Sequence, residues 1–220
     1  MVSRMEDFIF YDSPRNGDGC DFDATTLFEK SLVDYPFDEF LEIARNHSEG
    51  RIWIIGGFVY RNIIKELYGT PYEKRPIDID FLVEHHKEEV DRPRDWEIGR
   101  TFTGDLSFSK KDEYKIDLNG LVNFHSIVSQ NVDDPEIRHF YTGTPLNIQS
   151  ISYDCEKKVV EGEAGINAIR KRHVEINNII EAQWEVRRIN RKRNDSLSVD
   201  KYGSQKAAEL GFSYKSSGNF

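Results

Sequence analysis

The stretch Ile52-Trp-Ile-Ile-Gly-Gly-Phe-Val-Tyr-Arg-Asn-Ile-Ile-Lys-Glu-Leu-Tyr68, followed closely by Pro76-Ile-Asp-Ile-Asp-Phe-Leu-Val83, decides the fold. The apolar run at residues 52–55 is typical of a short buried strand. Gly56 and Gly57 allow a tight turn and expose backbone N–H groups to an anion. Apolar residues then recur at helical spacing from position 59 to position 67, so this segment predicts a strand, a glycine turn and a helix.

The second segment carries two carboxylates at strand spacing. Asp78 and Asp80 alternate with apolar residues, so both side chains are expected on one face of a strand. Two adjacent carboxylates repel each other unless a cation lies between them, and a hard divalent ion such as Mg²⁺ or Mn²⁺ prefers oxygen ligands. A metal ion there could hold the phosphates of a nucleotide placed over the two glycines. Either motif alone would be read as a solvated strand face or an ordinary turn, but their order favours a functional site.

These two motifs resemble the head domain of the polymerase-β-type nucleotidyltransferases, in particular the branch of CCA-adding enzymes and bacterial poly(A) polymerases. The pattern of that branch is GGxVRD followed by DxD. The glycine pair and Val59 match it, whereas Tyr60-Arg-Asn62 stands where the branch has its arginine–aspartate pair. The resemblance covers residues 36–178. It implies an α/β (α+β) fold with a mixed sheet flanked by helices and a short C-terminal helical appendage.

A third acidic residue is expected beside the first two. Residues 113–120 alternate apolar and polar side chains, which predicts a strand that carries Asp117. In the resembled fold the strand next to the DxD strand brings a further acid toward the metals. Asp117 is therefore the candidate to bind the catalytic metal and to help deprotonate the attacking hydroxyl. The alternative is a surface aspartate on an edge strand.

The resemblance also implies nucleotide contacts by Gly56, Gly57, Arg61 and Asn147. The glycines would hold the triphosphate. Asn147 falls on the asparagine of the second family motif, RRDFTxNALAY, which residues 137–154 resemble and which contacts the sugar and the triphosphate in the family. The plain alternative for Asn147 is an ordinary asparagine at the start of a strand.

Length and composition limit the class of protein. A chain of 220 residues is one medium domain, or one domain with a helical appendage. The formal net charge of −9 argues against a protein that mainly coats nucleic acid. Cys20 and Cys155 are too few for a disulfide scaffold or a cysteine-built zinc site. Without an apolar run of membrane-spanning length or a signal-peptide pattern, a reducing cytoplasm is the expected location.

Three parts are expected along the chain: an N-terminal extension at residues 1–35, the nucleotidyltransferase domain at 36–178, and a helical segment with a frayed tail at 179–220. Within the last part lies a basic cluster that consists of Arg187, Arg188, Arg191, Lys192 and Arg193. These cations could simply favour the C-terminal end of a helix, or they could face an RNA backbone. In CCA-adding enzymes a neck helix reads the incoming base through an acid and an arginine, and Glu181 with Arg187 or Arg188 would correspond.

Two functions from different classes follow. The first is a metal-dependent nucleotidyltransferase that moves a nucleoside monophosphate from an NTP to a hydroxyl and releases pyrophosphate. The acceptor would be an RNA 3′ end, a protein hydroxyl or a small molecule. The second is a non-catalytic nucleotide- or partner-binding member of the fold, such as a toxin–antitoxin or phage-defence component. A plain α/β metal-binding domain is a weaker third interpretation.

Overall fold

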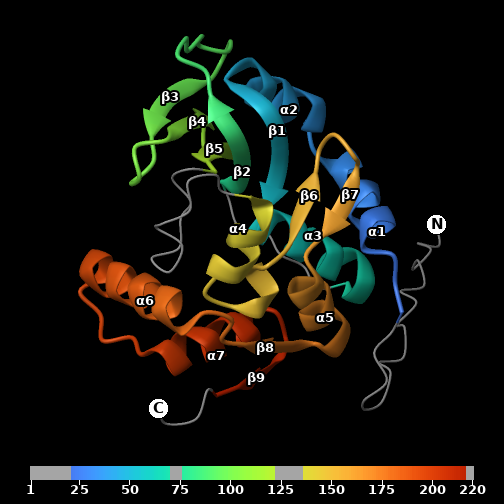
Figure 1. Cartoon of the computed structure of the whole chain (residues 1–220), viewed down its shortest axis with the longest axis vertical. Coiled ribbons are helices and arrows are strands. Elements are labelled where there is room, and N and C mark those ends of the chain that lie inside the picture. Colours follow the sequence, from blue (N-terminus) through green and yellow to red (C-terminus); the bar gives the residue numbers. More distant parts are fainter. Residues whose placement is uncertain (1–20, 70–75, 122–135, 217–220) are drawn as a thin grey trace, which may run out of the picture.

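The computed structural model describes residues 21–69, 76–121 and 136–216, and its centre is a seven-stranded mixed sheet (Figure 1). The strand order is β3-β4-β5-β2-β1-β6-β7, and β2 and β5 are parallel whereas the other neighbours are antiparallel. The strands are β1 (Ser48–Ile55), β2 (Ile77–His86), β3 (Glu97–Arg100), β4 (Leu106–Lys110), β5 (Tyr114–Gly120), β6 (Ser152–Asp154) and β7 (Val159–Glu161). This mixed sheet flanked by helices confirms the predicted fold class.

Three helices cover one face of the sheet. They are α1 (Ala24–Ser31), α2 (Phe37–Asn46) and α3 (Gly57–Tyr68), with the short helix η1 (Leu32–Asp34) between the first two. The register pairs Ile54 with Phe81 and Phe81 with Leu118, so these three side chains form a row that packs beneath the helices. Phe28 of α1 is fully buried in this core, so part of the expected N-terminal extension belongs to the body of the domain.

The opposite face of the sheet is covered more sparsely. Trp53, Ile55 and Leu82 form a second apolar cluster with Phe140 of α4 (Ile137–Gly143). Asp78 and Asp80 point to this face, because they alternate with the buried Ile79 and Phe81. The sparse cover leaves the polar half of this face open to a cleft.

The chain after residue 162, together with one short preceding helix, gathers at one end of the sheet (Figure 1). Its elements are the short helix η3 (Asn147–Gln149), α5 (Glu163–Lys171), β8 (His173–Glu175), α6 (Ile179–Arg193), α7 (Val199–Glu209) and β9 (Ser213–Lys215). β9 pairs in parallel with β8. The prediction of a frayed tail is therefore wrong for residues 213–215, because their backbone completes a second, two-stranded sheet.

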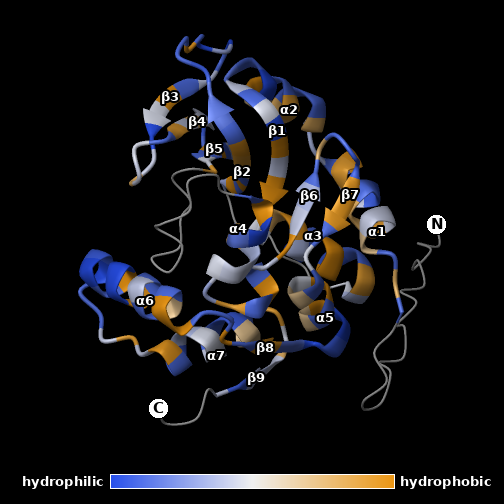
Figure 2. Ribbon diagram, in the orientation of Figure 1, coloured by the Kyte–Doolittle hydropathy of each residue, from blue (hydrophilic) through white to orange (hydrophobic). Residues whose placement is uncertain are grey.

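The distribution of hydropathy agrees with these layers. Figure 2 shows apolar residues along β1, β2 and α3, whereas the outer end of α6 is strongly hydrophilic. Within the described ranges, no helix is long and apolar enough to cross a membrane.

Candidate active site

The parallel pairing of β2 with β5 brings the three predicted carboxylates together. Asp80 lies opposite Asp117, and Asp78 lies opposite Lys115. On the other side of β2, Ile55 of β1 lies opposite Asp80, so the glycine turn begins one residue beyond the carboxylate pair. Since neighbouring strands are about 4.8 Å apart, the acidic groups and the turn share one small area of the sheet.

The turn itself requires glycine at its first position. Gly56 has φ +59° and ψ −123°, a conformation that side chains of L-residues strongly disfavour. Its N–H donates to the Ile151 carbonyl at 3.1 Å, so this group is not directed to an anion as expected. Gly57 is the first residue of α3, and the positive end of the helix dipole lies at this point. The predicted contact with an anion therefore depends on the N–H groups at the N-terminus of α3 and not on the N–H of Gly56.

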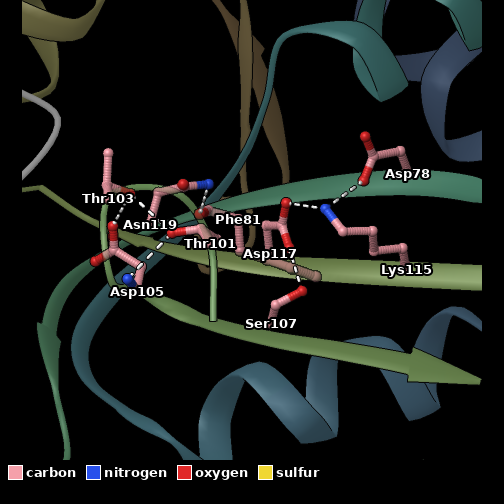
Figure 3. Close-up of polar contacts among 9 residues, drawn as sticks. All are labelled: Asp78, Phe81, Thr101, Thr103, Asp105, Ser107, Lys115, Asp117 and Asn119. Atoms are coloured by element: carbon pink, nitrogen blue, oxygen red, sulfur yellow. Dashed lines mark hydrogen bonds and ion pairs between the residues drawn. The ribbon is translucent and has the colours of Figure 1, made fainter. Parts of the chain in front are cut away.

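A lysine lies within the acidic group. The Lys115 ammonium contacts Asp117 Oδ2 and lies 3.5 Å from Asp78 Oδ1, between the two carboxylates (Figure 3). Burial lowers the pKa of Lys115, but the hydrogen bond to Asp117 and the charges of Asp78 and Asp80 outweigh this effect and raise it. Lys115 therefore stays protonated and acts as an internal counterion.

Asp117 is held from both sides. Its Oδ1 accepts a hydrogen bond of 2.6 Å from the Ser107 hydroxyl on β4, and its Oδ2 accepts from Lys115 (Figure 3). β5 lies between β4 and β2, so the alternative of a surface aspartate on an edge strand is wrong. The side chain of Asp117 is only 12% exposed. Such a carboxylate has a fixed orientation, as a ligand or a proton acceptor requires.

Asp80 has a strongly raised pKa. Burial raises its pKa to about 7, and the negative charges of Asp78 and Asp117 add to this effect. Lys115 opposes the shift without cancelling it. Near neutral pH this carboxyl is therefore partly protonated, and a cation beside it would favour its ionised form.

A cleft of about 340 Å³ lies over Asp80. Its floor is formed by residues 55–57 and Asp80, and Thr103 lies at its edge. The opposite walls come from the segment after α4 and from one side of α6. The residues that these two walls contribute are Gly143, Thr144, Pro145, Glu181, Trp184, Glu185 and Arg188. A ligand in this cleft would contact the glycine turn, one of the acids and α6 together.

The α6 wall combines an aromatic face with an ion pair. Trp184 is 40% exposed. Arg188 donates from Nε and Nη2 to the two carboxylate oxygens of Glu185, each at 2.7 Å. Such a planar pair presents hydrogen-bonding edges, and an exposed indole offers a surface for stacking. Of the acid and arginines expected here, Glu181 and Arg188 line the cleft, whereas Arg187 is exposed outside it.

Two predicted nucleotide contacts have other partners in the structure. The Asn147 amide oxygen accepts from the N–H groups of Ile148 and Glu175 at 2.8 and 3.1 Å, and its nitrogen donates to the His173 carbonyl at 3.3 Å. These bonds connect η3 with β8. The Arg61 guanidinium lies over the Tyr60 ring, 5.4 Å from its centroid, beside the glycine turn. Their contact with a nucleotide stays a prediction.

Four residues of this region were not predicted from the sequence: Ser107, Lys115, Trp184 and Glu185. Lys115 is two residues from Asp117 on β5, so the alternation alone places both side chains on one face. Only the register shows that Ser107 lies opposite Asp117 and that Lys115 lies opposite Asp78. Glu185 and Arg188 are three residues apart on a helix, a spacing that could have indicated their pairing.

The donor chemistry of these residues, carboxylate oxygens alone, suits a hard divalent cation. Three carboxylates gather on one face. Burial and the charges of Asp78 and Asp117 raise the pKa of Asp80, and a cation would offset both effects. In the described part of the chain, no three His, Cys, Asp or Glu side chains are yet close enough to hold one ion as they stand. The Lys115 ammonium lies between two of the acids. Asp78, Asp80 and Asp117 would hold the metal.

One solved structure shares this architecture. A CCA-adding enzyme in complex with ATP superimposes with a TM-score of 0.52 at 15% sequence identity, over 84% of this chain and 41% of that one. A Thermotoga maritima CCA-adding enzyme complexed with tRNA aligns with a TM-score of 0.47 at 14% identity, over 84% of this chain and 45% of that one. The chain thus spans less than half the length of these proteins. No family model and no curated protein matches the sequence.

The fold is therefore that of the polymerase-β-type nucleotidyltransferases, in the form of the head domain of CCA-adding enzymes, as predicted. At this level of identity the likeness concerns the fold. The functional interpretation has to come from the residues of the site.

Proposed function

We propose that this protein is a metal-dependent nucleotidyltransferase that transfers a nucleoside monophosphate from an NTP to a hydroxyl group. The observation that carries the proposal is the register of β1, β2 and β5, which sets the glycine turn, Asp80 and Asp117 side by side, with the turn and Asp80 lining one cleft. A triphosphate at the N-terminus of α3 would lie beside these acids. The ligand's base would then extend toward α6 and contact Trp184 and the Glu185–Arg188 pair.

The proposed chemistry is an in-line displacement at the α-phosphorus. The acceptor oxygen forms a bond to this phosphorus while the bond to the bridging oxygen breaks, and pyrophosphate leaves. Bound Mg²⁺ or Mn²⁺ would neutralise the phosphate charge and favour the deprotonated hydroxyl. Asp78 and Asp80 would hold the cation, and Asp117 would both bind it and take up the hydroxyl proton, in the orientation that Ser107 maintains.

The acceptor most compatible with the surface is RNA. Arg187, Arg191, Lys192 and Arg193 are exposed toward the C-terminal end of α6, the helix that also forms a wall of the cleft. Arg188 lies in the cleft and pairs with Glu185, so one member of the predicted basic cluster faces the cleft and the other four are exposed for contact with RNA. An RNA backbone on the four exposed cations would lead its end toward the cleft.

The test is the transfer of label from each of the four α-labelled NTPs in the presence of Mg²⁺ or Mn²⁺, with bulk RNA as the acceptor. We expect label in RNA with the wild type and a loss of at least about a thousandfold in Asp78→Ala and Asp80→Ala, because each removes a metal ligand. Asp112→Ala, which changes an exposed acid before β5, is the matched control. Equal transfer by all four proteins would contradict the proposal.

The second candidate function is a nucleotide-binding member without catalysis. Lys115 favours it, because an ammonium between Asp78 and Asp117 compensates the acids without a metal. This candidate predicts NTP binding that is unchanged by EDTA and is accompanied by no label transfer. Binding that requires a divalent ion would contradict it.

A further inference from the structure

The inference concerns Lys115 and the order in which cations occupy the acidic group, and it rests on the proposed function of that group. We propose that Lys115 is a positioning residue that competes with the divalent metal: its ammonium holds Asp78 and Asp117 in the metal-free protein and has to release Asp117 before the metal can bind fully. The lysine thereby weakens metal binding in the absence of nucleotide.

Both carboxylate oxygens of Asp117 already have partners in the metal-free structure. Ser107 occupies one carboxylate oxygen and Lys115 contacts the other, so neither oxygen is free of a hydrogen-bond donor (Figure 3). Ser107 is neutral and buried and can remain while a cation binds. Lys115 carries a positive charge that repels a divalent ion at the same oxygen. The lysine is therefore the group that has to move.

The second argument is that Lys115 is able to move. Its side chain is 38% exposed, and its contact with Asp78 is long, at 3.5 Å. A lysine has four rotatable side-chain bonds and a compact, well-hydrated head, so it can exchange a carboxylate for water. Asp117, at 12% exposure, is held in place by comparison.

The third argument is charge. Lys115 offsets one of the three negative charges and leaves Asp80 without direct contact with its ammonium in the contacts that the structure shows. Asp80, next to the glycine turn, is therefore the carboxylate that the ammonium leaves to a divalent ion. The triphosphate adds further negative charge there. A full metal complement is therefore expected only when metal and nucleotide arrive together.

The experiment compares Mn²⁺ binding to nucleotide-free wild type and Lys115→Met by electron paramagnetic resonance or calorimetry. Methionine keeps an unbranched side chain as far as the ε-carbon and removes the charged nitrogen. We expect Lys115→Met to bind Mn²⁺ at least about tenfold more tightly, because a positive charge a few ångströms from the ion is lost. Lys115→Arg retains the charge and should stay within a few-fold of the wild type. Lys111 is exposed and lies between β4 and β5, so the variant Lys111→Met controls for the change in net charge.

A second measurement uses thermal unfolding. Without metal, Lys115→Met should unfold at a lower temperature than the wild type, because three carboxylates then repel one another without a counterion. Saturating Mg²⁺ should raise its melting temperature more than that of the wild type. This readout involves no catalysis.

Equal or weaker Mn²⁺ affinity in Lys115→Met would overturn the inference, as would the absence of Mn²⁺ binding in both proteins. The outcome is separable from that of the proposed function. A protein that transfers no nucleotide, but whose Lys115→Met variant binds Mn²⁺ more tightly, contradicts the transferase and supports the competing lysine. An active transferase with equal affinities does the reverse.

Discussion

At the residue scale, Asp80 carries a charge that opposes folding when no metal is present. Burial, with the charges of Asp78 and Asp117, raises its pKa from 3.8 to about 7. The folded state therefore keeps a proton that the unfolded state loses, and the free energy of unfolding should decrease as the pH rises from about 4 to about 7. Above this range the ionised carboxylate destabilises the fold by up to about 4 kcal/mol, an upper limit because water screens the charge.

The variant Asp80→Asn should abolish this part of the pH dependence. In EDTA it should melt at a temperature close to that of the wild type near pH 4 and several degrees higher at pH 8. Differential scanning calorimetry across the pH range measures both. Asp112→Asn, at an exposed acid, should follow the wild type. Parallel curves for wild type and Asp80→Asn would show that Asp80 ionises normally.

The two glycines of the turn should respond differently to alanine. Gly56 has φ +59°, so Gly56→Ala introduces backbone strain and should lower the free energy of unfolding by about 1–3 kcal/mol. A Cβ on Gly57 would lie 3.1 Å from Arg61 Nη1, the end of a flexible side chain. Gly57→Ala should therefore keep its stability and lose nucleotide affinity, because the methyl group would displace the Arg61 guanidinium, a predicted nucleotide contact, beside the turn. Thermal melts and calorimetric titration with an NTP separate the effects, and unchanged affinity would place the triphosphate elsewhere.

The sequence could predict these residues but not all their partners. The alternation around Asp78 and Asp80 is a local pattern, and so is the glycine pair before an apolar helix. The contact of Asp117 with Ser107 and the position of Lys115 opposite Asp78 depend on the register between strands, because a shift of one residue would turn a side chain to the other face. Lys115 could therefore be placed on a strand, but its position between two acids could not be predicted.

At the scale of the elements, the pairing of β8 with β9 connects the C-terminal segment to the domain. Tyr214 of β9 packs against Gly203 of α7, where an added Cβ would lie 2.3 Å from a ring carbon, and its hydroxyl donates to Asp200 at 2.8 Å. Gly203→Ala should therefore destabilise the protein by about 1–3 kcal/mol through overpacking. Ser204→Ala, at the next and exposed position, should change stability by less than about 0.5 kcal/mol.

A double-mutant cycle in urea tests the cause of this effect. If the clash with the ring is responsible, Gly203→Ala should cost much less in a Tyr214→Ala background, because the ring is then absent. Additive losses would mean that the helix, and not the contact with β9, is sensitive at position 203.

The elements differ in how well the sequence predicts them. β1, β2 and β5 follow buried apolar or alternating runs, and burial of one face determines their pattern. β9 has only three residues, Ser213–Lys215, and none of them is buried. Its conformation comes from pairing with β8, about 40 residues earlier, and no local pattern reports such a partner.

At the scale of the whole molecule, charge is distributed unevenly. The chain has a net charge of −9, yet the outer end of α6 is basic and hydrophilic (Figure 2). An acidic protein attracts RNA only where cations are concentrated, so binding should be weak and confined to this end of the molecule. One helix, α6, both lines the cleft and carries the exposed cations, so a bound RNA strand could contact the cations and reach the cleft along this helix.

The dependence of RNA affinity on salt tests this path. Each phosphate that is neutralised on a single strand contributes about −0.7 to the slope of log K against log salt. Replacement of Arg191, Lys192 and Arg193 by glutamine should therefore weaken binding and reduce the magnitude of the slope by about 2. The control replaces the exposed lysines at positions 111, 158 and 171, which changes the net charge equally but lies away from α6. If both triple variants lose affinity to the same extent, the attraction depends on total charge alone. If the α6 variant retains the salt slope of the wild type, RNA binds elsewhere on the molecule. The acceptor must then reach the cleft from another side.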